Sequence, residues 1–362
     1  MIDETLMNFE ERSAYKLRSL YKKYGYFPYE MGKFEEYELY IRNKDFLVSD
    51  RVITINDTNG KLMALKPDVT LSIIKNGEDN KGVKQKVFYN ENVYRVSETT
   101  HRFKEIMQTG LECIGDIDIY DIYEVISLAA ESLSNLADNF CIEISNLDLV
   151  SSVIKSVCED PQFVSKVIYC ISEKNTHDLK RVCEEYSVND ADYTKISSLI
   201  SVYGERKNVV SKLNEIFTSP ELEKLAILSE MLENSLFSDK IRFDFSVVND
   251  MNYYNGFVYR GFVDGVCCGV LAGGQYDNMM KKMNRTSGAV GFAIYLDRIE
   301  DLYRENDKFD VDYLLLYDDK TDLVKISSKV SKLIASGLSV SAQKSVPEKL
   351  RYKNIMDLRK KD

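Results

Sequence analysis

The chain has 362 residues, of which 44% are hydrophobic and 29% are charged, and its formal net charge is −10. This composition is typical of an ordinary soluble globular protein of about two to three domains. The negative charge disfavours nucleic acid as a partner, no apolar run reaches the roughly 20 residues of a membrane span, and the acidic start MIDETLMNFEERS differs from a signal peptide.

The first part of the chain predicts one helix followed by strands. Helical spacing of apolar residues, with Glu early and Lys late, predicts a helix over 8–24 that ends at Gly25. Turn residues between two apolar runs predict a hairpin over 51–65. The next predicted elements are a helix from Thr70, antiparallel strands at 86–95 and 103–114, an amphipathic helix at 121–137 and a short strand in CIEISNL (141–147).

The middle of the chain changes character. Between residues 149 and 238 Gly204 is the only glycine, and charged and aliphatic residues alternate at helical spacing, which predicts an inserted block of about five helices. Strand patterns return in IRFDFSVV (241–248), in the run around 255–262 and in GVCCGVLAGG. Residues after about 307 predict a small tail of strand, helix, strand and a basic end.

This order of elements predicts an α+β fold. We expect a core formed by 1–148 and 239–304, an all-helical insertion over 149–238, and a short α/β C-terminal tail over 305–362.

The seven cysteines are scattered, and no two have C-x-x-C spacing. Only His101 and His177 could join them as ligands, so we expect no metal site. We expect reduced thiols that pack as small apolar residues in a cytoplasmic protein, including Cys267 and Cys268 on a strand.

The stretch DMNYYNGFVYRGF (250–262) begins a predicted strand with two tyrosines that follow three polar residues. A strand that only fills a core does not need this arrangement. The pattern therefore indicates a binding pocket.

Four strings in the chain carry a resemblance to a known family. They are VYR (93–95) with HRFKEIMQTGLECIG (101–115), then MNYYNGFVY (251–259), LAGGQYD (271–277) and GAVGFAIYLDRI (288–299). Together and in this order they resemble the class II aminoacyl-tRNA synthetase core, in its histidyl branch, over roughly residues 8–300. The resemblance implies an antiparallel sheet flanked by helices, an insertion after the first string, and a homodimer.

The resemblance also implies which residues form a histidine pocket. Asp68 would accept from the ligand ammonium, Gln108 would contact its polar end, and Glu112 would accept from an imidazole N–H. Tyr254 would offer its hydroxyl to the ring. The implied histidine-binding set is Asp68, Thr70, Gln108, Glu112, Tyr254 and Tyr276, and the implied phosphate-binding or anion-binding set is Arg95, Arg102 and Arg298.

Two positions depart from the family pattern on the nucleotide side. The histidyl synthetases have an arginine five residues before the second tyrosine of the YY pair, and this chain has Asn249 there. An amide does not supply the fixed charge that stabilises the developing charge on a reacting phosphate. Tyr295 occupies the place of a glycine that lets the nucleotide lie close to the sheet.

Two kinds of protein share this core: the histidyl-tRNA synthetases, and a paralogue that is the regulatory subunit of short-form ATP phosphoribosyltransferase. The departures favour the second kind, a subunit with no catalytic residues and no cofactor, which binds histidine for feedback at the first step of histidine biosynthesis. Its implied partners are L-histidine and the short catalytic subunit, within a hetero-oligomer. We do not expect tRNA or a membrane as a partner, because the tail is too short for a full anticodon-binding domain.

Two alternatives remain open at this stage. The chain could be a histidyl-tRNA synthetase-like enzyme that forms histidyl-adenylate, or a structural scaffold with a vestigial pocket. Arg95 and Arg298 could equally form ordinary structural ion pairs.

Overall fold

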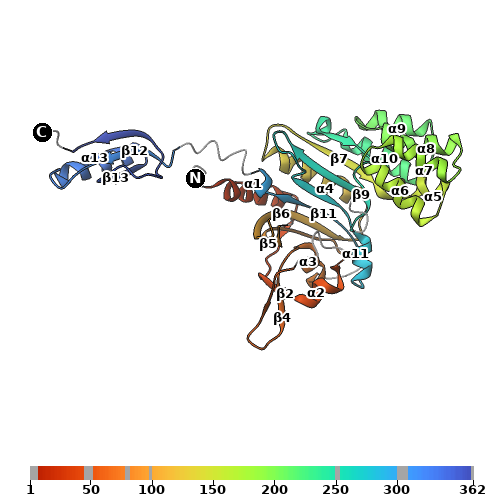
Figure 1. Cartoon of the computed structure of the whole chain (residues 1–362), viewed down its shortest axis with the longest axis horizontal. Helices are drawn as coiled ribbons and strands as arrows, with labels where there is room; N and C mark the ends of the chain where they lie inside the picture. The colour runs from red at the N-terminus through yellow and green to blue at the C-terminus, as the bar shows by residue number, and fades with distance from the viewer. Residues whose placement is uncertain are drawn as a thin grey trace. The chain divides into compact units, whose positions relative to one another are not determined.

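The computed structural model describes residues 7–44, 52–77, 82–97, 100–248, 253–299 and 309–359 (Figure 1). The chain divides into two compact units, Met1–Ile299 and Glu300–Asp362. None of the described helices is both long enough and apolar enough to cross a membrane.

An eight-stranded sheet forms the centre of the larger unit (Figure 1). In spatial order its strands are β1 (Phe27–Pro28), β5 (Gln85–Val96), β6 (Phe103–Gly115), β11 (Gly288–Tyr295), β10 (Leu271–Gln275), β9 (Asn255–Val263), β7 (Phe140–Asn146) and β8 (Ile241–Phe243). Neighbours from β5 to β7 pair antiparallel, and only the edge strands β1 and β8 pair parallel. The fold is α+β with an antiparallel-dominated sheet, which confirms the predicted fold class.

Helices α1 (Phe9–Lys23) and α4 (Ile119–Ser134) cover one face of this sheet. Both begin with a capping box, from Asn8 in α1 and from Asp118 in α4, so that the first backbone N–H groups are satisfied. The buried ring of Tyr21 packs on this face, and its hydroxyl lies 3.0 Å from the hydroxyl of Ser132 in α4. These contacts fix the two helices on the sheet.

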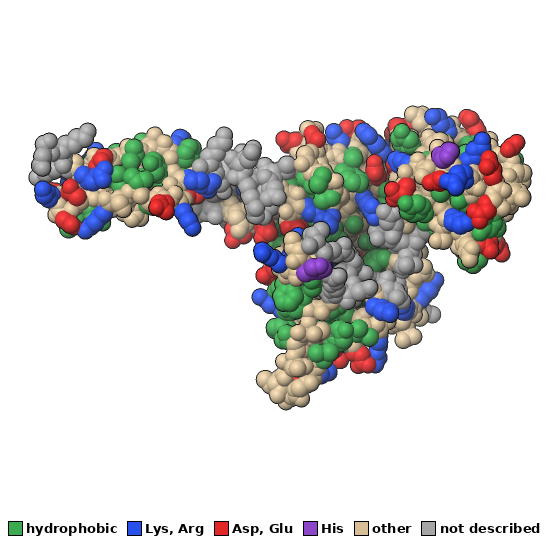
Figure 2. Space-filling model, viewed as in Figure 1, with side chains coloured by type: hydrophobic (Ala, Val, Ile, Leu, Met, Phe, Trp, Pro, Cys, Tyr) green, Lys and Arg blue, Asp and Glu red, His purple; other side chains and the backbone are tan. Residues whose placement is uncertain are grey.

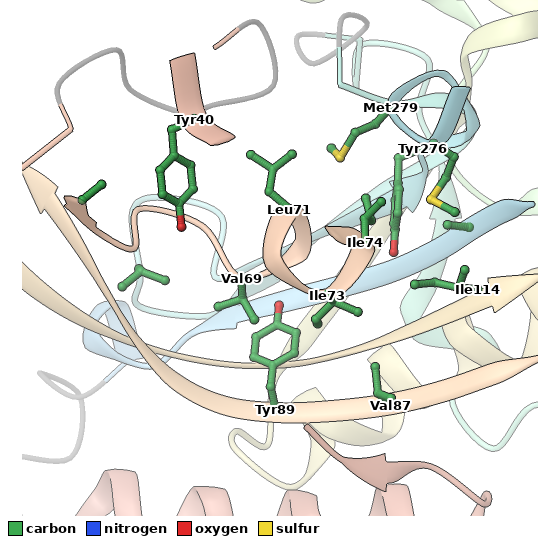
Figure 3. Close-up of a cluster of buried hydrophobic side chains, with 14 residues drawn as sticks. Tyr40, Val69, Leu71, Ile73, Ile74, Val87, Tyr89, Ile114, Tyr276 and Met279 are labelled. Atoms are coloured by element: carbon green, nitrogen blue, oxygen red, sulfur yellow. The ribbon is translucent and has the colours of Figure 1, made fainter. Parts of the chain in front are cut away.

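The opposite face carries shorter elements, most of them from the N-terminal part of the chain. They are α2 (Tyr37–Arg42), α3 (Thr70–Asn76), α11 (Asp277–Lys282) and a small antiparallel sheet of β2 (Phe34–Glu36), β4 (Leu62–Leu65) and β3 (Thr54–Asn56). Figure 3 shows the buried cluster between α3 and the large sheet, with Tyr89 of β5 directed toward Val69. Tyr276, just before α11, points down beside Ile74 toward the same strands.

Six helices form the block inserted between β7 and β8, within the continuously described range 100–248. Each begins at a residue whose side chain accepts a hydrogen bond from a first-turn N–H, which explains the sharp helix starts. These caps are Asn146, Asp160, Asn175, Asn189, Glu205 and Ser219. The helices are α5 (Leu147–Val157), α6 (Pro161–Ser172), α7 (Thr176–Glu185), α8 (Asp190–Ser201), α9 (Arg206–Asn214) and α10 (Pro220–Leu232).

On the face drawn in Figure 2, acidic and basic side chains are interspersed over the helical block. A surface of mixed sign differs from the continuous basic surface that tracks a nucleic-acid backbone.

The smaller unit has a three-stranded parallel sheet in the order β13-β12-β14. Its elements are β12 (Val311–Leu316), α13 (Leu323–Ala335), β13 (Val340–Gln343) and β14 (Tyr352–Asp357). Strand β14 lies in the segment for which the sequence predicts only a basic end.

Two sequence expectations about strands are wrong. The predicted strand over 241–248 ends at Phe243, because the Asp244 carboxylate accepts from both the N–H and the hydroxyl of Ser246 (2.9 and 2.7 Å) and turns the chain. Cys267 and Cys268 are exposed in bends before β10 and do not pack on a strand. Gly265, at φ +81°, turns the chain there, so that strand pairing resumes only near Leu271.

Candidate functional site

The segment between β4 and α3 is held against the large sheet by contacts with β5. The buried ammonium of Lys66 forms an ion pair with Glu91 of β5, and the Lys66 carbonyl accepts from the Tyr94 N–H (2.9 Å). Arg95 donates from Nε to the carbonyl of Pro67 (3.1 Å). These three contacts fix the backbone immediately before Asp68.

Asp68 is buried, and its Oδ1 accepts from the Leu71 N–H at the start of α3 (2.9 Å). Burial raises the pKa of the Asp68 carboxyl, while the Leu71 N–H and the nearby Arg95 guanidinium act in the opposite direction.

Gln108 and Glu112 lie four residues apart on β6 and therefore share one face of the sheet. Both side chains are buried. On the neighbouring strand β11, Tyr295 stands opposite Gln108 and Gly291 stands opposite Glu112. A Cβ on Gly291 would lie only 1.7 Å from Glu112 Oε2, so this glycine is what leaves room for the carboxylate.

Glu112 is the most deeply placed acid of the site, with an exposed fraction of 2%. Its two oxygens accept from the hydroxyls of Thr70 (2.8 Å) and Tyr276 (2.6 Å). Desolvation is the main cause that raises the Glu112 pKa to about 8, the two hydroxyls lower it, and the charge of Asp68 raises it further. Two neighbouring buried carboxylates thus share a site in which Glu112 has hydroxyl donors.

Three tyrosines extend the site from the other side. The rings of Tyr253 and Tyr254 lie 4.5 Å apart, and those of Tyr253 and Tyr276 lie 6.2 Å apart, measured between centroids. A Cβ on Gly274 would lie 2.8 Å from the Tyr254 ring, so this position also needs glycine.

The two arginines of the nucleotide side meet at one aromatic ring. The guanidinium carbons of Arg95 and Arg298 lie 6.0 and 4.2 Å from the centroid of Tyr295. Arg298 also donates to the carbonyl of Gly269, and Arg95 donates to Pro67 as described above. Both guanidinium groups therefore have partners within the fold.

Two predicted residues remain, Arg102 and Asn249. Arg102 is exposed in the connection between β5 and β6, where its carbonyl accepts from the Ser97 N–H (2.8 Å). Asn249 lies outside the described residues. No group of three or more candidate metal ligands occurs in the parts of the chain that the structure describes.

Sequence reasoning missed two tyrosines that line this face. Tyr89 on β5 is buried, stands opposite Gly110, and its hydroxyl would lie 2.6 Å from a Cβ placed there. Tyr259 on β9 donates to the carbonyl of Gly291 (2.9 Å). The available signal was Gly110 itself, since a glycine between Gln108 and Glu112 on one strand face leaves room for a large neighbour.

The arrangement is suited to binding a polar cation. Asp68 and Glu112 are acceptors in a buried site walled by phenol rings, and such a site discriminates strongly against ligands that leave its polar groups unpaired.

Comparison with known proteins places these observations in a family. The family profile described as histidyl-tRNA synthetase matches residues 3–299. A protein of Oceanobacillus iheyensis named ATP phosphoribosyltransferase regulatory subunit is 25% identical over 312 residues, which are 83% of this chain and 76% of the relative. A protein of the same name from Clostridium novyi is 28% identical, over 80% of this chain and 71% of the relative.

Solved structures show the same fold. A Bacillus halodurans structure, titled an ATP phosphoribosyltransferase regulatory subunit/histidyl-tRNA synthetase, superimposes with a TM-score of 0.77 at 21% identity, over 97% of this chain and 94% of that one. A chain of the Thermotoga maritima structure titled ATP phosphoribosyl transferase (HisG:HisZ) complex gives a TM-score of 0.64 at 19% identity, over 79% and 97%.

Proposed function

The chain belongs to the histidyl-tRNA synthetase family, and from this premise we propose that it is a non-catalytic regulatory subunit of ATP phosphoribosyltransferase that binds histidine. In this proposal it activates the short catalytic subunit at the first step of histidine biosynthesis and transmits feedback inhibition. It acts in the cytoplasm, as a homodimer within a hetero-oligomer.

The geometry of the carboxylates supports histidine as the ligand. An ammonium would neutralise Asp68, and an imidazole N–H would donate to Glu112. Each contact would offset the desolvation that raises the pKa values of these acids. Gln108, Tyr254 and Tyr276 would supply the remaining polar contacts, and Thr70 and Tyr276 already orient Glu112.

The position of Tyr295 is the observation that carries the non-catalytic part of the proposal. Adenylation requires cationic groups aimed at the reacting phosphate. Here Arg95 and Arg298 lie on the Tyr295 ring and donate to backbone carbonyls. The sequence adds Asn249, which carries no charge where the resemblance implies an arginine.

The names of relatives support the partner. Several relatives are named regulatory subunits of ATP phosphoribosyltransferase, and the Thermotoga maritima neighbour was solved as a complex. We therefore assign the short catalytic subunit as the partner, and we do not assign tRNA.

Histidine would act by favouring one arrangement of the pocket. The ligand would order the residues around Asp68 and Tyr254, and the preferred arrangement would change the contact with the catalytic subunit. Coupling of this kind is typically worth about 1–3 kcal/mol, which is enough for feedback inhibition.

Two measurements on the isolated chain test the proposal. Calorimetry should show binding of L-histidine in preference to other amino acids, and histidine-dependent ATP–pyrophosphate exchange should stay at the background of a protein-free control. Exchange that Arg298→Ala abolishes would instead identify an enzyme that forms histidyl-adenylate. Equal binding of unrelated amino acids would contradict histidine sensing.

A further inference from the structure

A cavity of about 740 Å³ is lined by none of the residues of the proposed histidine site. Its walls come from the edge strand β8, from β7 and from the inserted block, whose helices α9 and α10 lie beside this end of the sheet (Figure 1). The volume falls within the range of small-molecule sites, which is roughly 300–1,000 Å³.

Four of the eight charged side chains in the wall pair with one another. Lys174 pairs with Asp244, and its ammonium lies 4.5 Å from the centroid of the Tyr203 ring. The buried Arg206 pairs with Glu233 (2.9 Å) and donates to the Ile241 carbonyl (2.6 Å). These contacts hold the side chains of Lys174 and Arg206 in the wall of the cavity.

Glu143 of β7 also lines the cavity, and in the sheet it stands opposite Arg242 of β8 and Arg260 of β9. Its side chain is partly buried, and among the described residues no hydrogen bond or ion pair ends on its carboxylate. Desolvation is the main cause that raises the Glu143 pKa, and the charge of Asp244 raises it further. The charges of Lys174, Arg242 and Arg260 act in the opposite direction. A ligand cation placed here would gain a partly desolvated acceptor.

The rim of the cavity is apolar and exposed. Leu236 has an exposed fraction of 88% and Tyr203 one of 60%, and both line the cavity. The full lining carries five acidic and three basic side chains, so its charge is negative overall. A ligand that fits has a cationic head for the wall and an aliphatic stem for the rim.

We propose that this cavity binds a small aliphatic amine or guanidine, with its cationic head on Glu143 and its stem against Tyr203 and Leu236. The site is separate from the histidine pocket and does not depend on the function proposed above. Because it joins the inserted helices to the edge of the sheet, an occupant would bridge the two.

Calorimetry with 1,5-diaminopentane tests this site, with glutarate as a probe of the same chain length and opposite charge. The diamine should bind and glutarate should not. Glu143→Gln should weaken diamine binding by about tenfold or more, because a charge-assisted hydrogen bond is lost. Glu184→Gln, an equal change of charge at an exposed position on α7, should leave binding unchanged.

Two further variants separate this site from the others. Tyr203→Ala changes an exposed position that should tolerate the substitution, and we expect it to weaken binding of the diamine as well. Glu112→Gln should leave diamine binding intact. The proposal is overturned if the diamine does not bind, if glutarate binds equally well, or if Glu143→Gln binds the diamine like the parent chain.

Discussion

The guanidinium carbon of Arg298 lies 4.2 Å from the centroid of the Tyr295 ring. Arg95 approaches the same ring at 6.0 Å, so one phenol engages both arginines that the family resemblance assigns to phosphates. Cation–π contacts of this kind are worth about 0.5–2 kcal/mol each. A nucleotide would have to displace them before it could use either charge.

Replacement of Tyr295 should therefore expose the nucleotide side of the site. Tyr295→Gly removes the ring from both guanidinium groups, and we expect the variant to bind ATP several-fold more tightly than the parent chain in calorimetry. Tyr295→Phe is the matched control, because it keeps the ring and should bind ATP like the parent. Equal ATP affinity in all three proteins would show that Tyr295 does not block this site.

Glu112→Gln should abolish selective recognition of the imidazole. The amide keeps the shape of the side chain but cannot ionise to pair with the ligand, so we expect L-histidine affinity to fall by about tenfold or more. Glu105 lies on the same strand and is exposed, so Glu105→Gln is the matched control. If both variants bind histidine like the parent chain in calorimetry, the assignment of Glu112 is wrong.

The raised pKa of Glu112 also predicts how stability depends on pH. Folding raises this pKa from an unfolded value near 4.5 to about 8, so the folded chain holds the proton more tightly than the unfolded chain. The stabilisation is complete below the unfolded pKa and is lost as the pH rises toward the folded pKa. Between pH 4.5 and 8 the parent should lose stability relative to Glu112→Gln, by on the order of a few kcal/mol in total.

Urea unfolding of both proteins at several pH values checks this dependence. The difference in unfolding free energy between the parent and the variant should change from pH 4.5 to pH 8 and become constant above pH 8. A difference that is the same at pH 5 and at pH 8 would contradict the raised pKa.

The buried ion pair between Lys66 and Glu91 should matter more than the exposed one between Lys61 and Glu36. The Lys66 side chain is 1% exposed, whereas Lys61 and Glu36 are 54% and 47% exposed. Lys66→Met leaves the carboxylate of Glu91 without its partner and should cost about 3–5 kcal/mol of unfolding free energy. Lys61→Met should cost much less, because solvent screens that pair.

Urea denaturation of the two variants gives this comparison. The double change Lys66→Met with Glu91→Leu should recover part of the loss, since no charge then remains buried. Equal destabilisation by Lys66→Met and Lys61→Met would show that the buried pair does not hold the segment before Asp68.

Strong periodicity made the larger elements predictable from sequence. The long strand pair β5 and β6, helix α4 and the inserted helical block all lie where apolar spacing indicated. The two wrong strand predictions have local causes. Asp244 turns the chain through Ser246, and the exposed position of Cys267 follows from the Gly265 turn, which residue-type preferences alone do not reveal.

For the candidate site, the sequence indicated individual residues but not the contacts between them. The family strings indicated Glu112 and Tyr276, but their hydrogen bond joins residues 164 positions apart in the chain. The meeting of Arg95 and Arg298 at Tyr295 depends on strand register across β5, β6 and β11, and register is set by the whole sheet.

The most direct test of the central claim is the activity of the short ATP phosphoribosyltransferase subunit from the same cell, measured with this chain and with increasing L-histidine. We predict that the parent chain raises activity and that histidine then lowers it, whereas a Glu112→Gln chain still activates but no longer confers inhibition by histidine. If activity is unchanged on adding the chain, or if inhibition persists unaltered with Glu112→Gln, the account is contradicted.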